Sequence, residues 1–131
     1  MTSRQKALFV AALARAKKAE DTVILDMRKL SSITDFFIIA TASSIKRSQT
    51  ISDNIEEGLL EEKERICSIE GYSEGRWILI DAYDVVAHIF SSELRQFYNL
   101  EGLWGDAPQV ILCQREKRKN KRPSKKPSKR K

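Results

Sequence analysis

The sequence is poor in the residues from which catalytic and cofactor sites are usually built. Its five glycines stand at positions 58, 71, 75, 102 and 105, so neither a P-loop nor a G-x-G-x-x-G dinucleotide motif can be written anywhere. The serines of Thr41-Ala-Ser-Ser44 lack the flanking glycines of a nucleophile elbow. The single histidine, His88, alternates with Val86 and Phe90 along a short apolar run. This pattern favours a packed or rim histidine over a member of a Ser/His/Asp triad.

Cysteine is also scarce, and long apolar runs are absent. Cys67 and Cys113 have neither C-x-x-C spacing nor a histidine at ligand distance in the sequence. We therefore expect two inert thiols in a reducing compartment rather than a disulfide or a zinc site. No window approaches the roughly 20 apolar residues that a membrane span needs. Together these features favour a cytoplasmic protein, and 131 residues suit a single domain.

Acidic residues nearly disappear at the C-terminal end. Residues 114–131 hold eleven Lys or Arg and one Glu, a net charge of +10, whereas the other 113 residues hold thirteen basic and seventeen acidic groups, a net charge of −4. A segment rich in Lys, Pro and Ser without aromatic residues cannot bury a core, so we predict a disordered basic tail after a domain over residues 1–113. Its cations suit RNA phosphates without sequence specificity, and a solubilising extension without a target is the alternative. The tail residues expected to bind RNA weakly are Arg115, Lys117, Arg118, Lys119, Lys121 and Arg122.

The first nineteen residues contain no acid, a composition that organelle transit peptides share. We favour a structural helix instead, because apolar residues recur at helical spacing and Thr2 or Ser3 can serve as N-cap. The predicted apolar stripe consists of Phe9, Ala12, Leu13 and Ala16.

Two apolar runs and a long amphipathic segment follow. Residues 22–27 and 35–41 are short and rich in β-branched residues, which predicts buried strands. The second run is apolar on both faces, as expected of a central strand covered by helices. Ser43 or Ser44 can cap a helix that runs to about Lys63, with Ile51, Ile55 and Leu59 as its buried stripe. Gly58 within that helix indicates close packing.

Three further short strands are predicted over residues 66–70, 76–81 and 85–90. The connections between them are compact, so we expect antiparallel pairing. Ser91 or Ser92 then opens a short helix, and residues 110–113 form a last apolar group suited to an edge strand. This order predicts an α/β (α+β) domain, a mixed sheet of about five strands flanked by helices.

Four aspartates fall at predicted strand ends, where a metal-dependent nucleotidyltransferase would collect its ligands. They are Asp26, Asp35, Asp81 and Asp84. A donor-rich phosphate pocket is missing, and aspartates at such positions commonly close turns. Metal catalysis is therefore the weaker hypothesis, and we expect no metal and no cofactor.

Residues 70–90 and 95–106 hold seven of the ten aromatic residues, among them both tryptophans. Segments rich in Trp and Tyr but poor in reactive groups are typical of binding surfaces. Trp77 and Leu79 are candidate contacts on the strand over residues 76–81, although a core position for Trp77 is equally compatible with the sequence. Tyr98 and Trp104 carry polar atoms and can sit half exposed at an interface.

Lys46 and Arg47 occupy the first turn of the predicted long helix, where the helix dipole disfavours cations. With Thr41, Ser43 and Ser44 they can meet an acidic partner surface or a phosphate. Two solvated side chains are the alternative, and the sequence does not choose between these readings.

Several separated motifs resemble the ribosomal silencing factor (RsfS, or Iojap-like) family. They are Thr22-Val-Ile-Leu-Asp26, Ser32-Ile-Thr-Asp-Phe-Phe-Ile-Ile-Ala-Thr-Ala-Ser43, Trp77-Ile-Leu-Ile-Asp81, Asp84-Val-Val-Ala-His-Ile-Phe90 and Arg95-Gln-Phe-Tyr-Asn-Leu-Glu-Gly-Leu-Trp104. The resemblance spans residues 4–107. Ala42 stands where the family usually has Gly, and Gly102 where it usually has Arg or Lys.

The resemblance implies a nucleotidyltransferase-like fold without catalytic machinery. It also implies binding to ribosomal protein L-fourteen of the large subunit, which would block joining of the small subunit and repress translation when nutrients are short. The expected contacts to that partner are Thr41, Ser43, Ser44, Lys46, Arg47, Trp77, Leu79, His88, Tyr98 and Trp104. A general RNA-binding protein acting through its tail is a further alternative, and a homodimer of the free protein remains open.

Overall fold

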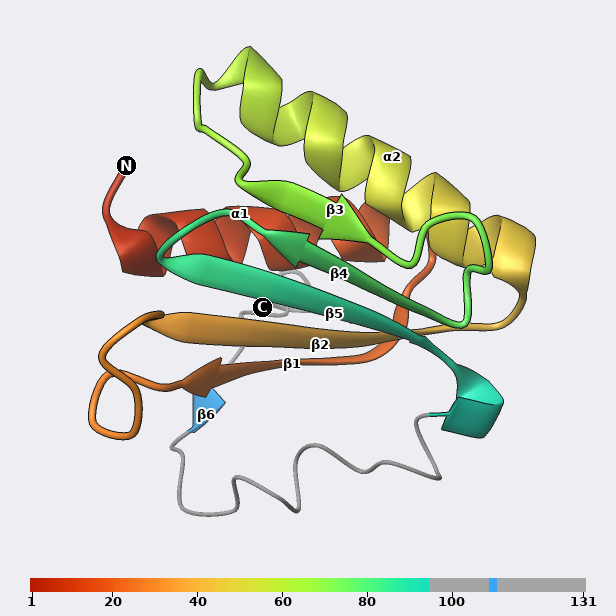
Figure 1. The fold of residues 1–131 in the computed structure, drawn as a ribbon, viewed down its shortest axis with the longest axis horizontal. Coiled ribbons are helices and arrows are strands. Elements are labelled where there is room, and N and C mark those ends of the chain that lie inside the picture. Colours follow the sequence, from red (N-terminus) through yellow and green to blue (C-terminus); the bar gives the residue numbers. More distant parts are fainter. Residues whose placement is uncertain (95–108, 111–131) are drawn as a thin grey trace, which may run out of the picture.

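The computed structural model describes residues 1–94 and 109–110. In these residues a mixed sheet forms one layer and two helices form the other (Figure 1). The elements along the chain are α1 (Ser3–Ala16), β1 (Glu20–Asp26), β2 (Phe36–Ala42), α2 (Ile45–Glu61), β3 (Ser68–Glu70), β4 (Trp77–Asp81), β5 (Val85–Ser91) and β6 (Gln109–Val110). The predicted fold class is confirmed, with six strands instead of about five because β6 is a two-residue edge strand.

The strand order is β3-β4-β5-β2-β1-β6. The β3–β4–β5 meander is antiparallel, as its short connections predicted. β2 pairs antiparallel with β1 and parallel with β5. This parallel pair requires the chain to cross over through α2 and the β3–β4 hairpin before β5 returns to the centre of the sheet.

The main hydrophobic core lies between the sheet and both helices. Alternate strand residues such as Ile38, Ile78 and Ile89 pack there against the buried faces of α1 and α2. Leu25, Met27, Ile39 and Phe90 form a smaller buried cluster from the opposite strand faces. β2 is an interior strand, as predicted. In residues 1–94 and 109–110, α1 and α2 lie on one face of β2, and helices over its other face stay a prediction.

α1 is a structural helix, and Thr2 is its N-cap as predicted. The Thr2 hydroxyl accepts from the Gln5 backbone N–H, and the Gln5 side chain accepts from the Thr2 N–H, which completes a capping box. The predicted stripe is partly right, because Phe9 and Leu13 pack against the main core. Helix α1 buries Ala7, Val10, Ala11 and Ala14, whereas Phe9 and Leu13 are half-buried and Ala12 and Ala16 are exposed. Small residues face the sheet because they let the helix approach it closely.

α2 agrees with its sequence pattern. The Ser44 hydroxyl accepts from the Arg47 N–H at 3.0 Å, and Ile51, Ile55 and Leu59 are buried. Gly58 lies where the two helices pack closely, since a β-carbon there would lie 2.5 Å from Leu13 Cδ1. Among the described residues no helix combines the length and apolarity that a bilayer span requires.

Three strand-end aspartates serve local structure. Asp26 accepts from the Arg28 guanidinium, which holds the pKa of this carboxyl below its usual range. Asp81 accepts from the Tyr83 N–H at 3.0 Å, and Asp84 accepts from Lys6 Nζ at 2.9 Å. Because each carboxylate already has a partner in a turn or a helix, they do not converge on a shared ion.

Candidate protein-binding face

The side of β4 and β5 that faces away from α1 and α2 gathers aromatic and aliphatic side chains from three strands. Along β4, Ile78 and Ile80 point into the main core, so Trp77 and Leu79 lie on the opposite face. Trp77 pairs with Phe90, and Leu79 pairs with His88. Phe37 of the next strand contacts His88 with ring centroids 4.8 Å apart. We call Phe37, Trp77, Leu79, His88 and Phe90 the β4–β5 face.

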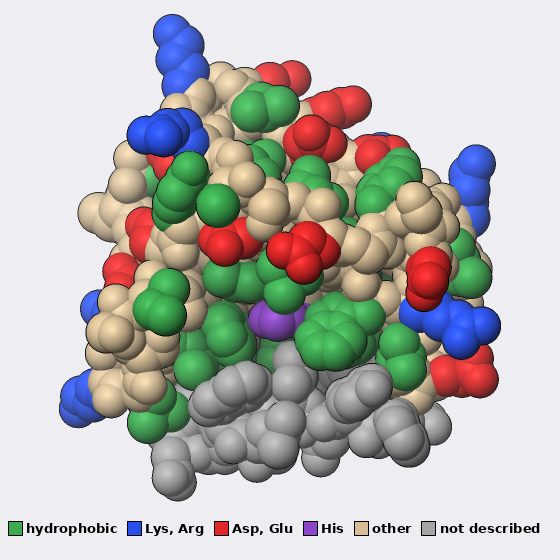
Figure 2. All heavy atoms as spheres, viewed as in Figure 1, with side chains coloured by type: hydrophobic (Ala, Val, Ile, Leu, Met, Phe, Trp, Pro, Cys, Tyr) green, Lys and Arg blue, Asp and Glu red, His purple; other side chains and the backbone are tan. Residues whose placement is uncertain are grey.

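The exposure of these side chains is graded. Trp77 is 36% exposed, Leu79 and Phe37 are half-buried, and His88 and Phe90 lie beneath them at 5% and 1%. The Trp77 ring tilts against Phe90 at a centroid distance of 5.0 Å. Figure 2 shows the His88 imidazole, in purple, as a small spot among hydrophobic side chains. Trp77 thus stands at the surface on a buried aromatic base.

A hydrogen bond joins the two polar rings of this face. Trp77 Nε1–H donates to His88 Nδ1 at 3.2 Å. Burial disfavours the charged imidazolium and lowers the pKa of His88 to about 4, so the ring is neutral at pH 7. Because Nδ1 accepts, the proton of the neutral ring resides on Nε2. That buried Nε2 has no hydrogen-bond partner in the described part of the chain.

A pocket of about 280 Å³ opens beside Trp77. Glu70, Gly71, Trp77 and Leu79 line it. Gly71 has φ +79°, a left-handed conformation that favours glycine, and here it turns the chain out of β3. Trp77 and Leu79 form an apolar wall of the pocket, and Glu70 adds an exposed carboxylate. The volume is large enough to receive a side chain of a partner.

The second group of predicted contacts lies where β2 leads into α2. Thr41 is buried on the same face as Phe90, with which it pairs. Ser43, Ser44 and Lys46 are exposed, and Arg47 is half-buried. Phe90 pairs with Thr41 on one side and with Trp77 on the other. The contacts predicted around Trp77 and those predicted around Thr41 therefore meet at the same end of the strands.

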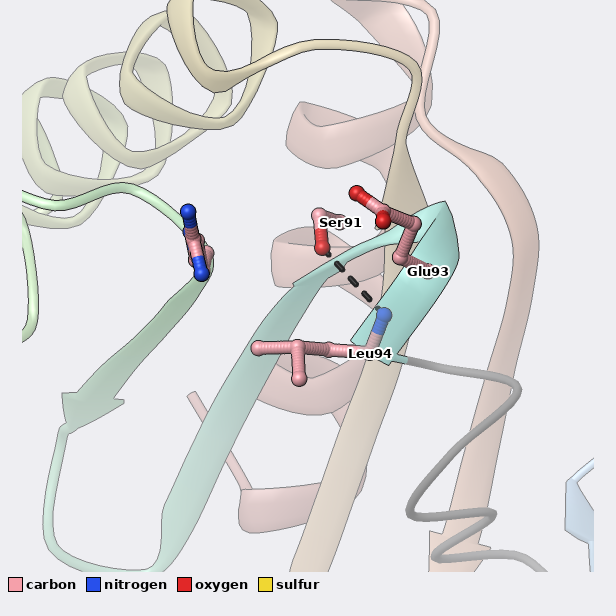
Figure 3. A pocket seen from close by; sticks show the side chains of 4 residues that line it. Ser91, Glu93 and Leu94 are labelled. Carbon is pink, nitrogen blue, oxygen red and sulfur yellow. Dashed lines mark hydrogen bonds between the residues drawn. The ribbon is translucent and has the colours of Figure 1, made fainter.

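A second pocket of about 250 Å³ lies at that end of the strands. It is lined by Arg76, Ser91, Glu93 and Leu94. Figure 3 shows the Ser91 hydroxyl accepting from the Leu94 N–H, at 3.3 Å, which caps the helix that starts at Ser92 as predicted. Leu94 packs against the smaller cluster beneath the β4–β5 face, so this pocket continues the candidate binding surface.

Some predicted contacts fall outside the described residues. They are Tyr98, Trp104 and the tail residues Arg115, Lys117, Arg118, Lys119, Lys121 and Arg122. Cys113 also lies there, whereas Cys67 is an exposed free thiol. In residues 1–94 and 109–110 no group of three metal-ligating side chains is close enough to hold an ion.

The sequence interpretation missed Phe37, Glu70, Gly71 and Phe90 as members of this region. The signal for Phe37 and Phe90 was available, because each lies on the opposite strand face from its core-forming neighbours. Glu70 and Gly71 reach the pocket only through the β3–β4 pairing, in which Glu70 stands beside Leu79. That register is not visible in the local pattern.

Fold and surface together define a two-layer α/β domain with a partly exposed aromatic face suited to protein binding. The chain belongs to the ribosomal silencing factor family, whose model, described as ribosomal silencing factor during starvation, matches residues 1–131.

Curated relatives and solved structures agree with the family assignment. A ribosomal silencing factor RsfS of Halalkalibacterium halodurans is 47% identical over 73% of this chain and 82% of its own length. That of Bacillus subtilis is 41% identical over 79% and 88%. A crystal structure of a Chromobacterium violaceum protein superposes with a TM-score of 0.78 at 30% identity, covering 80% of this chain and 88% of that one. One from Bacillus halodurans gives 0.73 at 40% identity over 82% and 99%.

Proposed function

We propose that this protein binds ribosomal protein L-fourteen on the large ribosomal subunit through the β4–β5 face. Occupying that site blocks association with the small subunit and represses translation under nutrient limitation. The mechanism is occupancy and needs no turnover, so the protein is not an enzyme. Its place of action is the cytoplasm, on the ribosome.

The observation that carries this proposal is the exposed Trp77 on its buried aromatic base. Large aromatic side chains that rest on a rigid base and border a pocket are common anchors of protein interfaces. The Trp77 ring packs at a tilt against Phe90, donates a hydrogen bond to His88 and borders the 280 Å³ pocket. A side chain held in this way loses little conformational freedom on binding.

The alternative function, metal-dependent nucleotidyl transfer, has weak support in the described residues. Asp26 and Asp84 are paired with Arg28 and Lys6, and Asp81 closes its own turn. A catalytic ion would have to displace these partners and draw together carboxylates that now serve different turns.

The test is binding of purified ribosomal protein L-fourteen by calorimetry. Truncation of a central aromatic anchor costs about 2 kcal/mol or more of binding energy, so we expect Trp77→Ala to weaken binding at least about 30-fold. Leu79→Ala should weaken it less, because Leu79 is the smaller side chain. The matched control is Leu60→Ala, which removes a 56% exposed side chain from α2, away from the β4–β5 face, and should bind normally.

A subunit-joining assay then tests the mechanism. The unsubstituted protein should reduce the fraction of joined ribosomes in a sucrose gradient, and Trp77→Ala should not. A folded Trp77→Ala variant that binds and blocks joining like the control would contradict the proposal. The oligomeric state of the free protein is measured on the same samples, because a homodimer formed through the same face would dissociate on binding.

A further inference from the structure

His88 occupies a position where an imidazole is a poor choice for stability. The ring is 5% exposed among Phe37, Trp77 and Phe90, and its buried Nε2 has no hydrogen-bond partner in the described residues. A buried donor without an acceptor is destabilising, whereas an apolar side chain of similar shape carries no such penalty.

The only hydrogen bond that the described residues give this imidazole is the one from Trp77 Nε1–H to Nδ1. Of the contacts that Trp77 makes with His88 and Phe90, this bond is the one that distinguishes between two orientations of the indole. The tilted contact with the Phe90 ring, at a centroid distance of 5.0 Å and an interplanar angle of 33°, allows two orientations that differ by a flip of the indole about its Cβ–Cγ bond. The hydrogen bond is satisfied by one of them only, because indole carries a single N–H donor at one edge.

We propose that His88 is a positioning residue for docking: it holds the Trp77 indole in one orientation, with the N–H directed inward and the carbon edge presented to the partner. This inference rests on the proposed function, since it assigns a role behind the anchor of that interface. It also specifies the partner group that meets Trp77. That group packs against ring carbon atoms and needs no acceptor for the indole N–H.

The experiment that separates a positioning role of His88 from a packing role replaces His88 by Phe and by Asn. His88→Phe keeps a flat ring but removes both the acceptor and the unsatisfied donor. His88→Asn keeps an acceptor, because Oδ1 of Asn stands at the same number of bonds from Cβ as Nδ1 of His. Unfolding by denaturant and binding to ribosomal protein L-fourteen are measured for both variants and for the unsubstituted protein.

We expect the two readouts to move in opposite directions. His88→Phe should unfold at an equal or higher denaturant concentration, yet bind up to about tenfold more weakly, the worth of one hydrogen bond. His88→Asn should be less stable, because it leaves a cavity, yet bind better than His88→Phe. If both variants lose stability and affinity in parallel, His88 is only a packing residue and the proposal is overturned.

The orientation itself is read from the indole N–H resonances in a ¹⁵N–¹H spectrum of the free protein. The sequence has two tryptophans, Trp77 and Trp104, and a Trp104→Phe variant assigns them. We expect the Trp77 indole proton to shift and to exchange faster with solvent in His88→Phe, but not in His88→Asn. An unchanged resonance in His88→Phe overturns the positioning role whether or not ribosomal protein L-fourteen binds. Failure of the unsubstituted protein to bind overturns the proposed function instead, and the indole result stands.

Discussion

Gly71 and Trp77 approach each other so closely that a β-carbon on Gly71 would overlap the backbone carbonyl oxygen of Trp77. Gly71 also has φ +79°, a conformation that side-chain-bearing residues rarely adopt. The loop from Gly71 to Gly75 is anchored to α2, where Ser48 Oγ donates to Gly75 O at 2.6 Å and Gln49 Nε2 donates to Tyr72 O at 2.8 Å. The loop that holds the backbone beside Trp77 therefore packs against the N-terminal part of α2.

Gly71→Ala should lower the free energy of unfolding by about 2 kcal/mol or more, because it adds a backbone clash to a strained φ. It should also weaken binding to ribosomal protein L-fourteen, since relief of the clash displaces Trp77. Denaturant unfolding and calorimetry measure the two effects. The neighbouring control, Tyr72→Ala, removes an exposed side chain that donates to Asp53, and should cost under about 1 kcal/mol. Equal stability of the two variants would contradict this account of the turn.

Lys6 is a buried cation that ties α1 to the β4–β5 turn. Its Nζ donates to Ala82 O at 2.7 Å and to Asp84 Oδ1 at 2.9 Å, and Glu64 lies 3.4 Å away. Lys6→Met should cost about 1–3 kcal/mol, because the Ala82 carbonyl loses its donor in a buried place. The Asp84 side chain is 41% exposed and can turn to water, which limits the loss. Lys17→Met, at the exposed end of α1, should change the unfolding free energy by under about 0.5 kcal/mol.

The lowered pKa of His88 makes stability depend on pH in a defined window. The folded-state pKa is about 4, against 6.5 for an unperturbed imidazole, so between these values the unfolded chain binds more protons. Stability due to His88 is therefore full above pH 6.5 and is lost as the pH falls toward 4, by about 3 kcal/mol. Glu70 and Asp81 are carboxylates on the same sheet face.

The difference in unfolding free energy between the unsubstituted protein and His88→Phe isolates the histidine from those carboxylates. Measured from pH 7.5 to pH 4.5, this difference should grow in favour of His88→Phe as the pH falls. A difference that stays constant over that range would show that the imidazole is not buried in its neutral form.

The basic tail is expected to strengthen attachment to the ribosome without choosing the site. Removal of residues 114–131, which carry a net charge of +10, should lower affinity for the large subunit and flatten its dependence on salt, because fewer counterions are released from rRNA. Binding to isolated ribosomal protein L-fourteen should hardly change. Equal salt slopes for the full-length and truncated proteins would rule out an RNA role and leave the solubilising extension.

The local pattern predicted most elements because each depends on residues close in sequence. Ser44 caps α2, and Ile51, Ile55 and Leu59 are buried as their spacing indicated. For α1 the pattern identified only the periphery of the core, because Phe9 and Leu13 pack against it but stay half-buried. The sheet instead packs against Ala7, Val10 and Ala11, because the distance between a helix and a sheet is set by the whole packed layer.

The sequence by itself determined the order of elements, the absence of phosphate-binding and nucleophile motifs, and the family, through motifs separated along the chain. It could not determine which side chains meet on the β4–β5 face. Trp77, His88 and Phe37 come together because β5 lies between β4 and β2, an arrangement of distant segments with a fixed register. Only the tertiary structure decides that His88 is buried behind an exposed Trp77, since burial and hydrogen bonding depend on neighbours that the chain brings from far away.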